Sequence, residues 1–367
     1  MKVVLTGGGT GGHVYPAISI AQALADAVPD VEILYMGSSH GPEGEIARGA
    51  GLEFAAIPSG PLTKALSVRN ASSLGKLIVG VFRARRILKR FGPDVVIGTG
   101  GYVTAAILLA QRRKIVIHEQ NARPGRTNLM LARFADKICV TFEASAAFLP
   151  RDKVVVTGLP IRREFRSLPD KAEARRALGL SEDAFTIVAV GGSQGARKPN
   201  EIVAAAWPIL DDGATQLLHQ VGARNIDEMS ARPGLPEEHP RYRVEAYIDM
   251  PLALASADLV VSRSGASTIA EIAAVGLPSI LFPYPHAYAD HQTTNARCLV
   301  DGGAAVLCSD ASTTPETLAG IISDLRDSPD KLAAMARASA ALGKPDAADR
   351  VAQIALSIAD CGLRNGE

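Results

Sequence analysis

The chain of 367 residues carries almost no excess charge of either sign, and only 5% of its residues are aromatic. Lysine and arginine together number 39, against 38 aspartate and glutamate, so the whole molecule has no general attraction for nucleic acid. Any basic site must therefore be local. Cysteine is scarce as well. The four cysteines lie far apart and form no Cys-x-x-Cys pair, which argues against a zinc site or a disulfide framework and fits a reducing compartment.

Long apolar runs are also missing. The chain passes from Met1 directly into the strand-like residues 3–5 and then into glycines, without the apolar stretch and cleavage site of a signal peptide. Runs such as residues 103–110 fall far short of the about 18 apolar residues that indicate a membrane span. We therefore expect a soluble or peripheral protein. Its length and its 47% apolar composition predict about two domains with large cores.

Short β-branched runs alternate with helical patterns along the whole chain, which predicts βαβ units and parallel sheets. The expected strands are 2–6, 32–36, 94–97, 114–117, 137–141 and 153–157, then 186–190, 216–219, 243–247, 259–262 and 279–282. We place a domain boundary after Arg162, where residues 163–180 become polar and helical. The expected domains are 1–162 and 163–344. Ligands of such sheets bind beyond the carboxyl ends of the strands, so we expect the sites to face a cleft between the domains.

A glycine-rich loop follows the first expected strand, with Gly7, Gly9 and Gly12 at the spacing of a dinucleotide fingerprint. A NAD site also needs an acidic residue at the end of the second strand, whereas that strand runs into residues 37–39, which are Gly-Ser-Ser. His13 and the valine after it stand where a Walker A motif has Lys-Ser or Lys-Thr. Two interpretations stay open: an anion cradle at the start of a helix, or a tight strand-to-helix turn.

Several strings of residues, taken together and in this order, resemble the MurG family of bacterial N-acetylglucosaminyltransferases. They are Gly8–Pro16, Gly98–Val103, His118–Ala122, Gly191–Arg197, Ser262–Thr268 with Glu271, and Asp290–Gln292 with Asn295-Ala296. Each string alone is modest evidence, but the full set spans residues 8 to 296 in the family's order.

The resemblance implies a GT-B fold, in which two Rossmann-like domains with parallel sheets face a central cleft. Domain 1–162 binds the acceptor and the membrane, domain 163–344 binds the UDP-sugar, and a final helix of about residues 345–367 returns to the first domain. No Asp-x-Asp triplet occurs in the chain, which disfavours a metal-dependent glycosyltransferase. We therefore expect no cofactor and no essential metal.

The activity that the resemblance implies is an inverting transfer of N-acetylglucosamine from UDP-N-acetylglucosamine. The acceptor is the 4-hydroxyl of undecaprenyl-diphosphate-N-acetylmuramyl-pentapeptide, so that lipid I becomes lipid II in peptidoglycan synthesis. The implied location is the cytoplasmic face of the cell membrane, peripherally bound to an anionic membrane surface. Other proteins of cell-wall synthesis are expected as partners, and nucleic acid is not.

His13 is the candidate catalytic residue, because an imidazole at the start of a helix has a pKa near working pH and can accept the proton of the acceptor hydroxyl. A structural helix cap is the alternative. The donor-binding residues that the resemblance implies are Thr10, Gly11, Gly12, Arg162, Ser193, Ile248, Ala266, Ser267, Thr268, Glu271, Gln292 and Asn295. The acceptor-binding residues that it implies are Gly12, His13, Gly100, Gly101, Tyr102, Glu119 and Asn121.

Three of these assignments have specific alternatives. Glu271 is expected to hold the donor's ribose, but Thr268 and Glu271 also fit a capping box, in which Glu271 satisfies the start of its own helix. Gln292 and Asn295, three residues apart, share a helix face and are expected to bond sugar hydroxyls, whereas a solvated helix face is the alternative.

The sequence departs from the family pattern at residues 104–106, which are Thr-Ala-Ala, and at Leu159, where the family has asparagine. These departures keep a second enzyme hypothesis open, a diacylglycerol glycosyltransferase of the same superfamily. A nucleotide-sugar-binding protein without turnover is the hypothesis from another class, since such a protein would have no need of His13.

Residues 74–91 predict a basic amphipathic helix that contacts the membrane. Its expected apolar stripe is Leu74, Leu77, Ile78, Val81, Leu88 and Phe91, and its cations are Arg83, Arg85, Arg86, Lys89 and Arg90. The alternative is a helix that packs this stripe on its own domain, because core-facing helices show the same periodicity.

Overall fold

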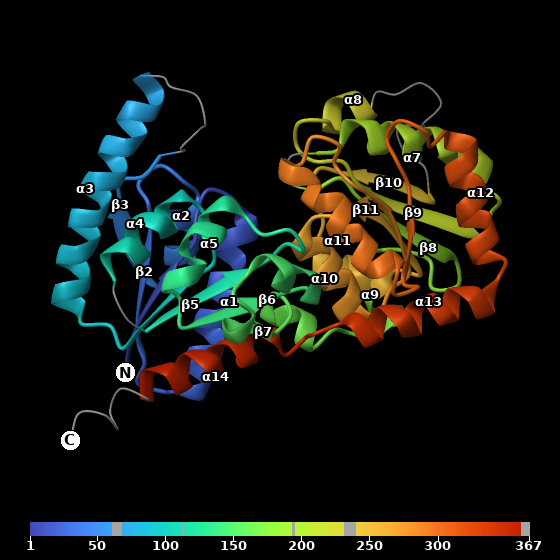
Figure 1. The fold of residues 1–367 in the computed structure, drawn as a ribbon. Helices are drawn as coiled ribbons and strands as arrows, with labels where there is room; N and C mark the ends of the chain where they lie inside the picture. Colours follow the sequence, from blue (N-terminus) through green and yellow to red (C-terminus); the bar gives the residue numbers. More distant parts are fainter. Residues whose placement is uncertain (61–67, 112–113, 193–194, 231–239, 361–367) are drawn as a thin grey trace. The chain divides into compact units, whose positions relative to one another are not determined.

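The computed structural model describes residues 1–60, 68–111, 114–192, 195–230 and 240–360. The chain divides into two compact units, which are Met1–Arg162 with Lys344–Glu367 (unit 1) and Arg163–Gly343 (unit 2). Each unit is an α/β fold built on one parallel sheet (Figure 1).

Unit 1 contains a seven-stranded sheet in the order β3-β2-β1-β4-β5-β6-β7. Its strands are β1 (Lys2–Thr6), β2 (Glu32–Ser38), β3 (Glu53–Ile57), β4 (Val95–Gly98), β5 (Ile115–Glu119), β6 (Lys137–Val140) and β7 (Val154–Val156). Its helices are α1 (Gly11–Ala27), α2 (Glu43–Gly49), α3 (Val68–Phe91), α4 (Tyr102–Ala110), α5 (Arg126–Leu131) and α14 (Ala347–Asp360), with 3-10 turns η1 (Ala132–Phe134), η2 (Glu143–Phe148) and η3 (Arg151–Lys153).

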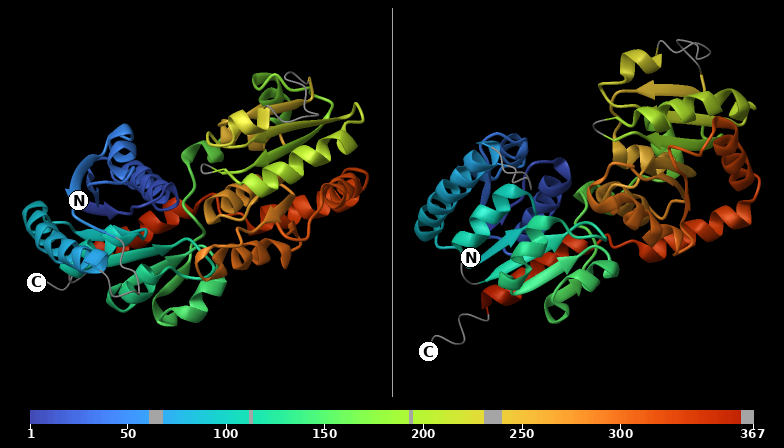
Figure 2. Two further views of the ribbon diagram at one scale, coloured as in Figure 1. Left: turned by 90° about the horizontal axis from the view of Figure 1, so that it is seen from above. Right: turned by 45° about the horizontal axis from the view of Figure 1, so that its top comes forward.

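Helices cover both faces of this sheet. Successive strand residues point to opposite faces, so Val3 and Leu5 pack with α1, α2 and α14, whereas Val4 packs with α3, α4 and α5. All three side chains are fully buried. The C-terminal helix α14 packs against α1, and both views of Figure 2 show this red helix along the blue and green elements of unit 1.

Unit 2 contains a six-stranded sheet in the order β10-β9-β8-β11-β12-β13. Its strands are β8 (Phe185–Val190), β9 (Thr215–Gln220), β10 (Tyr242–Glu245), β11 (Leu259–Arg263), β12 (Ser279–Phe282) and β13 (Ala305–Leu307). Its helices are α6 (Lys171–Ala177), α7 (Arg197–Leu210), α8 (Ile226–Ser230), α9 (Met250–Ser256), α10 (Ala266–Val275), α11 (His291–Val300), α12 (Pro315–Arg326) and α13 (Pro329–Leu342), with 3-10 turns η4 (Arg163–Arg166) and η5 (Tyr288–Asp290).

The core of unit 2 again has two sides. Ile187 and Leu217 pack with α7, α12 and α13 on one face of the sheet. Val188 and Leu218 follow them in the strands and are just as buried, because the opposite face is covered as well. A sheet buried on both faces explains why its strands are continuous apolar runs.

The expected strands are all present, but the structure contains two more, β3 and β13. Both lie at an edge of their sheet, and their residues are largely half-buried or exposed. Short edge strands need no continuous apolar run, so their sequences carry little of the signal that marks the central strands.

The apolar stripe expected on residues 74–91 lies mostly inside unit 1. In α3, Leu77, Val81, Leu88 and Phe91 pack against the core beneath them, so the packed alternative is correct for these residues. The description of Leu74 does not extend to its side chain. Ile78 of the expected stripe is instead 51% exposed, and it lies with two further exposed apolar residues of α3, Val79 and Phe82, whose exposed fractions are 57% and 71%.

Candidate functional site

The loops after β1, β4 and β5 meet at one edge of unit 1, because these strands are neighbours and run parallel. The Gly8 amide donates a hydrogen bond to the Gly100 carbonyl at 3.2 Å. Gly101 has a φ of +91°, and a Cβ added there would lie 2.3 Å from the Gly8 carbonyl oxygen. The two glycine turns are thus in backbone contact, which side chains at these positions would prevent.

His13 lies in the first turn of α1, close to both glycine turns. Its Nδ1 atom is 3.1 Å from the Gly8 carbonyl oxygen. A carbonyl only accepts, so Nδ1 carries the hydrogen and Nε2 keeps its lone pair. The Thr99 hydroxyl donates to the His13 carbonyl at 2.7 Å, and the ring lies against Gly100.

Burial lowers the pKa of the His13 imidazole, and the hydrogen bond to Gly8 and the charge of Glu43 offset part of that effect. The ring is therefore neutral at neutral pH, with Nε2 as the atom able to accept a proton. The alternative role of a structural helix cap does not fit His13, since its Nδ1 atom bonds a carbonyl outside the helix. The N-cap residue of α1 is Thr10, whose side chain caps no helix amide.

Glu119, at the end of β5, is enclosed by hydrogen bonds from the turn that follows it. It accepts from the Asn121 and Gly125 amides at 2.9 and 3.0 Å, and from the Asn128 side chain at 2.8 Å. Burial raises the pKa of this carboxyl, and these donors offset part of the rise. Only 1% of Glu119 is exposed, so the geometry favours a role in shaping the turn over the direct acceptor contact that the resemblance implies.

The other acceptor candidates differ in accessibility. Tyr102, at the start of α4, is 49% exposed, and Asn121 is half-buried. His118, which precedes Glu119 in β5, is fully buried and donates from Nε2 to the Gly158 carbonyl at 2.9 Å. Burial lowers the pKa of His118 to about 4, so this imidazole stays neutral and structural.

In unit 2, helix α10 begins directly after β11, with Gly265 as its N-cap residue. Ser267 and Thr268 therefore lie in the first turn, where amide groups without helical partners attract anions. The turn before the helix is fixed to α11: the Ser264 hydroxyl donates to the Gln292 carbonyl at 2.8 Å, and the Asn295 side chain donates to the Ser264 carbonyl at 3.3 Å.

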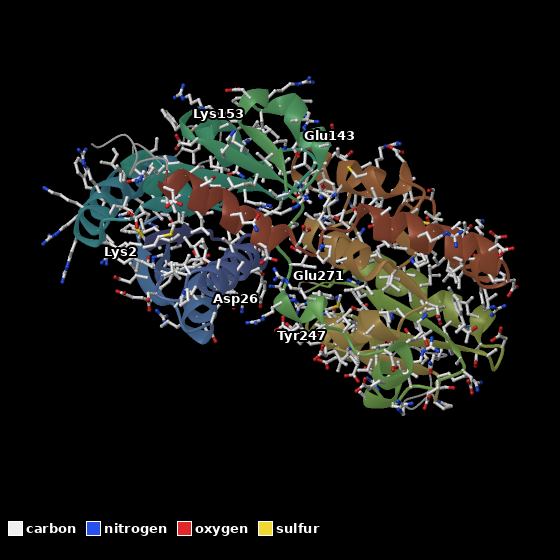
Figure 3. All side chains as sticks on the ribbon, turned by 90° about the horizontal axis from the view of Figure 1, so that it is seen from below. Lys2, Asp26, Glu143, Lys153, Tyr247 and Glu271 are labelled. Atoms are coloured by element: carbon white, nitrogen blue, oxygen red, sulfur yellow. The ribbon has the colours of Figure 1, made fainter. Side chains whose placement is uncertain are left out.

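The capping-box alternative for Glu271 is wrong. A capping box needs its threonine at the N-cap, whereas α10 begins at Ala266 and Thr268 is already inside the helix. Glu271 is 8% exposed. Figure 3 labels it on α10, together with Tyr247, the exposed residue beyond the end of β10.

Gln292 and Asn295 do not form the shared sugar-facing surface that their spacing suggests. Asn295 is fully buried, and its amide serves the Ser264 turn. Gln292 is half-buried and accepts from the Tyr284 amide through Oε1 at 2.9 Å. The helix face therefore points at the loops it supports, with Gln292 the more accessible of the two.

For three further donor candidates, the structure gives at most the burial and the position in the chain. Arg162 ends the first of the two segments that form unit 1 and is half-buried. Ile248, half-buried, follows β10, which is separated from β8 by β9. Ser193 lies outside the described residues.

Sequence reasoning missed Arg263, the last residue of β11. Its guanidinium binds both carboxylate oxygens of Asp310, at 2.6 and 2.8 Å, and also donates to the Phe282 and Pro283 carbonyls. Arg263 thus joins the loops after β11, β12 and β13. The sequence signal that could have indicated this role is an arginine between two serines at the end of an apolar strand. A charged side chain at such a position requires a partner of opposite charge.

A pocket of about 630 Å³ in unit 2 is separate from these residues. It is lined by residues such as Ala257, Asp258 and Pro278, which precede β11 and β12. It therefore lies at the amino ends of the strands, opposite the edge that carries the Ser264 turn.

Comparison with known proteins identifies the family. Residues 3–140 match the glycosyltransferase family 28 N-terminal domain, and residues 186–351 match the glycosyltransferase family 28 C-terminal domain. Relatives from Desulforudis audaxviator and Moorella thermoacetica are each 42% identical, over 99% of this chain and 100% of theirs. Both are named UDP-N-acetylglucosamine–N-acetylmuramyl-(pentapeptide) pyrophosphoryl-undecaprenol N-acetylglucosamine transferase. The crystal structure of MurG from Acinetobacter baumannii is 29% identical, with a TM-score of 0.77 over 97% of this chain and 99% of that one.

The chain belongs to the MurG family. It is a glycosyltransferase, and the expected α/β fold of the GT-B class, with one parallel sheet in each unit, is confirmed.

We expect Asn295→Ala to lower the free energy of unfolding of unit 2 by about 1–3 kcal/mol, because the Ser264 carbonyl loses a buried donor. Urea titration followed by Trp207 fluorescence measures this directly, since the chain's single tryptophan lies in the core of the same unit. The control is Arg297→Ala on the exposed side of α11, which should change stability by no more than about 0.5 kcal/mol. Equal midpoints for the two variants would contradict the bracing role of Asn295.

Proposed function

We propose that this enzyme transfers N-acetylglucosamine from UDP-N-acetylglucosamine to the 4-hydroxyl of undecaprenyl-diphosphate-N-acetylmuramyl-pentapeptide, with inversion at the anomeric carbon. The observation that carries the proposal is the 42% identity, over 99% of this chain, to transferases named for this donor and acceptor. The geometry of unit 1 supports it, because His13 presents a neutral imidazole with an unprotonated Nε2 beside the glycine turns.

In the proposed reaction, Nε2 of His13 takes the proton of the acceptor hydroxyl as that oxygen bonds to the anomeric carbon. The bond from the anomeric carbon to the diphosphate breaks on the opposite side, and UDP leaves with the electron pair. The amides at the start of α10, with the hydroxyls of Ser267 and Thr268, stabilise the charge on the departing diphosphate. No step requires a cofactor.

The remaining assignments are part of the same proposal. Glu271 holds the donor's ribose. The other donor contacts are Thr10, Gly11, Gly12, Arg162, Ser193, Ile248, Ala266 and Gln292. The acceptor contacts are Gly12, Gly100, Gly101, Tyr102 and Asn121, while Glu119 and Asn295 act by positioning the turns that they bond.

Release of UDP tests the proposed function against its alternatives. The purified enzyme is incubated with UDP-N-acetylglucosamine and, separately, with a lipid I analogue, with diacylglycerol or with no acceptor. The proposal predicts UDP formation with the lipid I analogue alone. UDP formation with diacylglycerol would support the glycolipid synthase, and donor binding without any turnover would support a nucleotide-sugar-binding protein.

His13→Ala should lower kcat by about two to four powers of ten, the usual range for a lost general base, while affinity for UDP-N-acetylglucosamine changes little. His40→Ala is the matched control, since His40 is an exposed histidine of the same unit. Steady-state kinetics with the lipid I analogue measures the effect. Near-normal turnover of His13→Ala would remove this residue from the mechanism.

Glu271→Ala should bind UDP-N-acetylglucosamine at least about tenfold more weakly, because charge-assisted hydrogen bonds to the ribose hydroxyls are lost. Titration calorimetry gives the affinity, and a melting curve of the same sample gives the stability. We expect a melting temperature close to that of the parent. Unchanged affinity with a clearly lower melting temperature would assign Glu271 to the fold of unit 2 instead.

We also propose that α3 binds an anionic membrane surface, on the cytoplasmic face of the cell membrane, where the lipid-linked acceptor lies. No helix in the described part of the chain is long and apolar enough to span a bilayer. Ile78, Val79 and Phe82 are exposed on α3, and nitrogen-tipped side chains project outward from this helix in Figure 3. Exposed apolar side chains flanked by cations suit the boundary between headgroups and acyl chains.

Charge reversal of three exposed cations, Arg85→Glu, Arg86→Glu and Lys89→Glu together, should weaken binding to anionic vesicles at least about tenfold, since each cation contributes on the order of 1 kcal/mol near such a surface. Sedimentation with phosphatidylglycerol-containing vesicles measures this, with phosphatidylcholine vesicles as the control. The variant should still turn over a soluble, short-chain acceptor at the rate of the parent enzyme. Unchanged sedimentation would exclude α3 as the membrane contact.

A further inference from the structure

Glu43 is a fully buried carboxyl beside the glycine turn of unit 1. It is the first residue of α2, and its Oε1 atom accepts a hydrogen bond from the Ser38 amide, at the end of β2, at 2.8 Å. Among the described residues, no group bonds its Oε2 atom. A buried carboxyl with one free oxygen is costly, so its place requires an explanation beyond the packing of α2.

Three glycines make room for this side chain. A Cβ added at Gly8 would lie 2.5 Å from Oε1 of Glu43, and one added at Gly37 would lie 2.6 Å from its Cγ. A Cβ at Gly41 would overlap Oε2. Residues from the ends of β1 and β2 and from the start of α2 are thus shaped around one carboxyl. Gly8, which lies against this carboxyl, is also the residue whose carbonyl bonds His13.

The charge of Glu43 reaches the imidazole as well. The surrounding elements carry several titratable groups: Glu43, Glu45 and Arg48 on α2, Tyr35 on β2, Tyr102 on α4, and His118 and Glu119 on β5. Of these, Glu43 is the group whose charge raises the pKa of His13, against the lowering by burial. Burial and then the same charge raise the pKa of Tyr35, whose hydroxyl donates to the Gly7 carbonyl at 2.7 Å.

We propose that Glu43 is a positioning residue for His13: its carboxylate seats the Gly8 peptide, and its negative charge stabilises the imidazolium that forms when His13 accepts a proton. The side chain is fully buried, so it acts through Gly8 and through space. The inference rests on the proposed role of His13 for its effect on turnover. Its effect on the His13 ring is independent of that role.

Two measurements on the full chain test the proposal. The first is an NMR titration of the His13 ring in the free enzyme, with the resonance assigned by its loss in His13→Ala. The second is the split between kcat and KM. The test variant is Glu43→Gln, which removes the charge at nearly constant shape and keeps an oxygen for the Ser38 amide. The matched control is Glu45→Gln, which removes an exposed carboxylate from the same helix.

In Glu43→Gln the titration midpoint of His13 should move to lower pH, because the charge that favours the imidazolium is gone. The acid limb of the kcat/KM profile should move in the same direction. We expect kcat to fall roughly three- to thirtyfold, with KM for UDP-N-acetylglucosamine changed less than about twofold. Glu45→Gln should match the parent in all of these readouts. A purely structural role of Glu43 would lower the melting temperature without moving the His13 midpoint.

A parent-like His13 midpoint in Glu43→Gln would overturn the proposal. If that variant fails to fold, Glu43→Asp decides. It keeps the charge but withdraws it from Gly8, so its His13 midpoint should lie below the parent's and its kcat should lie between those of the parent and of His13→Ala. Parent values for both would overturn the proposal. Normal turnover of His13→Ala with a shifted midpoint in Glu43→Gln would instead overturn the proposed base and leave the interaction between Glu43 and His13 in place.

Discussion

The contact between the glycine turns after β1 and β4 is the constraint on which the candidate site of unit 1 depends. Gly8 bonds Gly100 through its amide and His13 through its carbonyl. Gly101 has a positive φ and lies so close to the Gly8 carbonyl oxygen that a side chain at position 101 would collide with it. The close approach of two strand ends thus sets the orientation of a ring on the following helix. Backbone atoms, which cannot change rotamer, hold His13 more firmly than another side chain would.

In unit 2, polar side chains rather than glycine contacts hold the turns of the candidate site in place. The turn between β11 and α10 is bonded to α11 through Ser264 and Asn295, and Arg263 joins it to the loops after β12 and β13. These groups are buried or half-buried and their bonds lie within the unit. Amides at the start of α10 therefore stay in place without a bound anion, which is what electrostatic stabilisation of a leaving diphosphate requires.

The sequence allowed the fold class and the central strands to be predicted, because parallel strands buried on both faces leave continuous apolar runs. It did not reveal β3 and β13, whose edge positions demand little burial. The spacing of the motifs singled out His13 and the Ser264 turn. It could not distinguish residues that would contact a ligand from residues that hold a neighbouring turn in place. Glu119 and Asn295 look like binding residues in sequence, and only their hydrogen bonds show that they serve neighbouring turns. Gly37 and Gly41 precede Glu43 closely in sequence, but its contact with Gly8 joins two distant parts of the chain and could not be read from either of them.

The tautomer of His13 is the most direct test of this account, because the proposed base is the nitrogen that the Gly8 carbonyl leaves free. Nitrogen-15 NMR of labelled histidine side chains in the free enzyme at neutral pH distinguishes the two ring nitrogens of a neutral imidazole. The account predicts a protonated Nδ1 and an unprotonated Nε2 for His13. A proton on Nε2 at that pH would contradict it, since the atom assigned to accept the acceptor's proton would already be occupied.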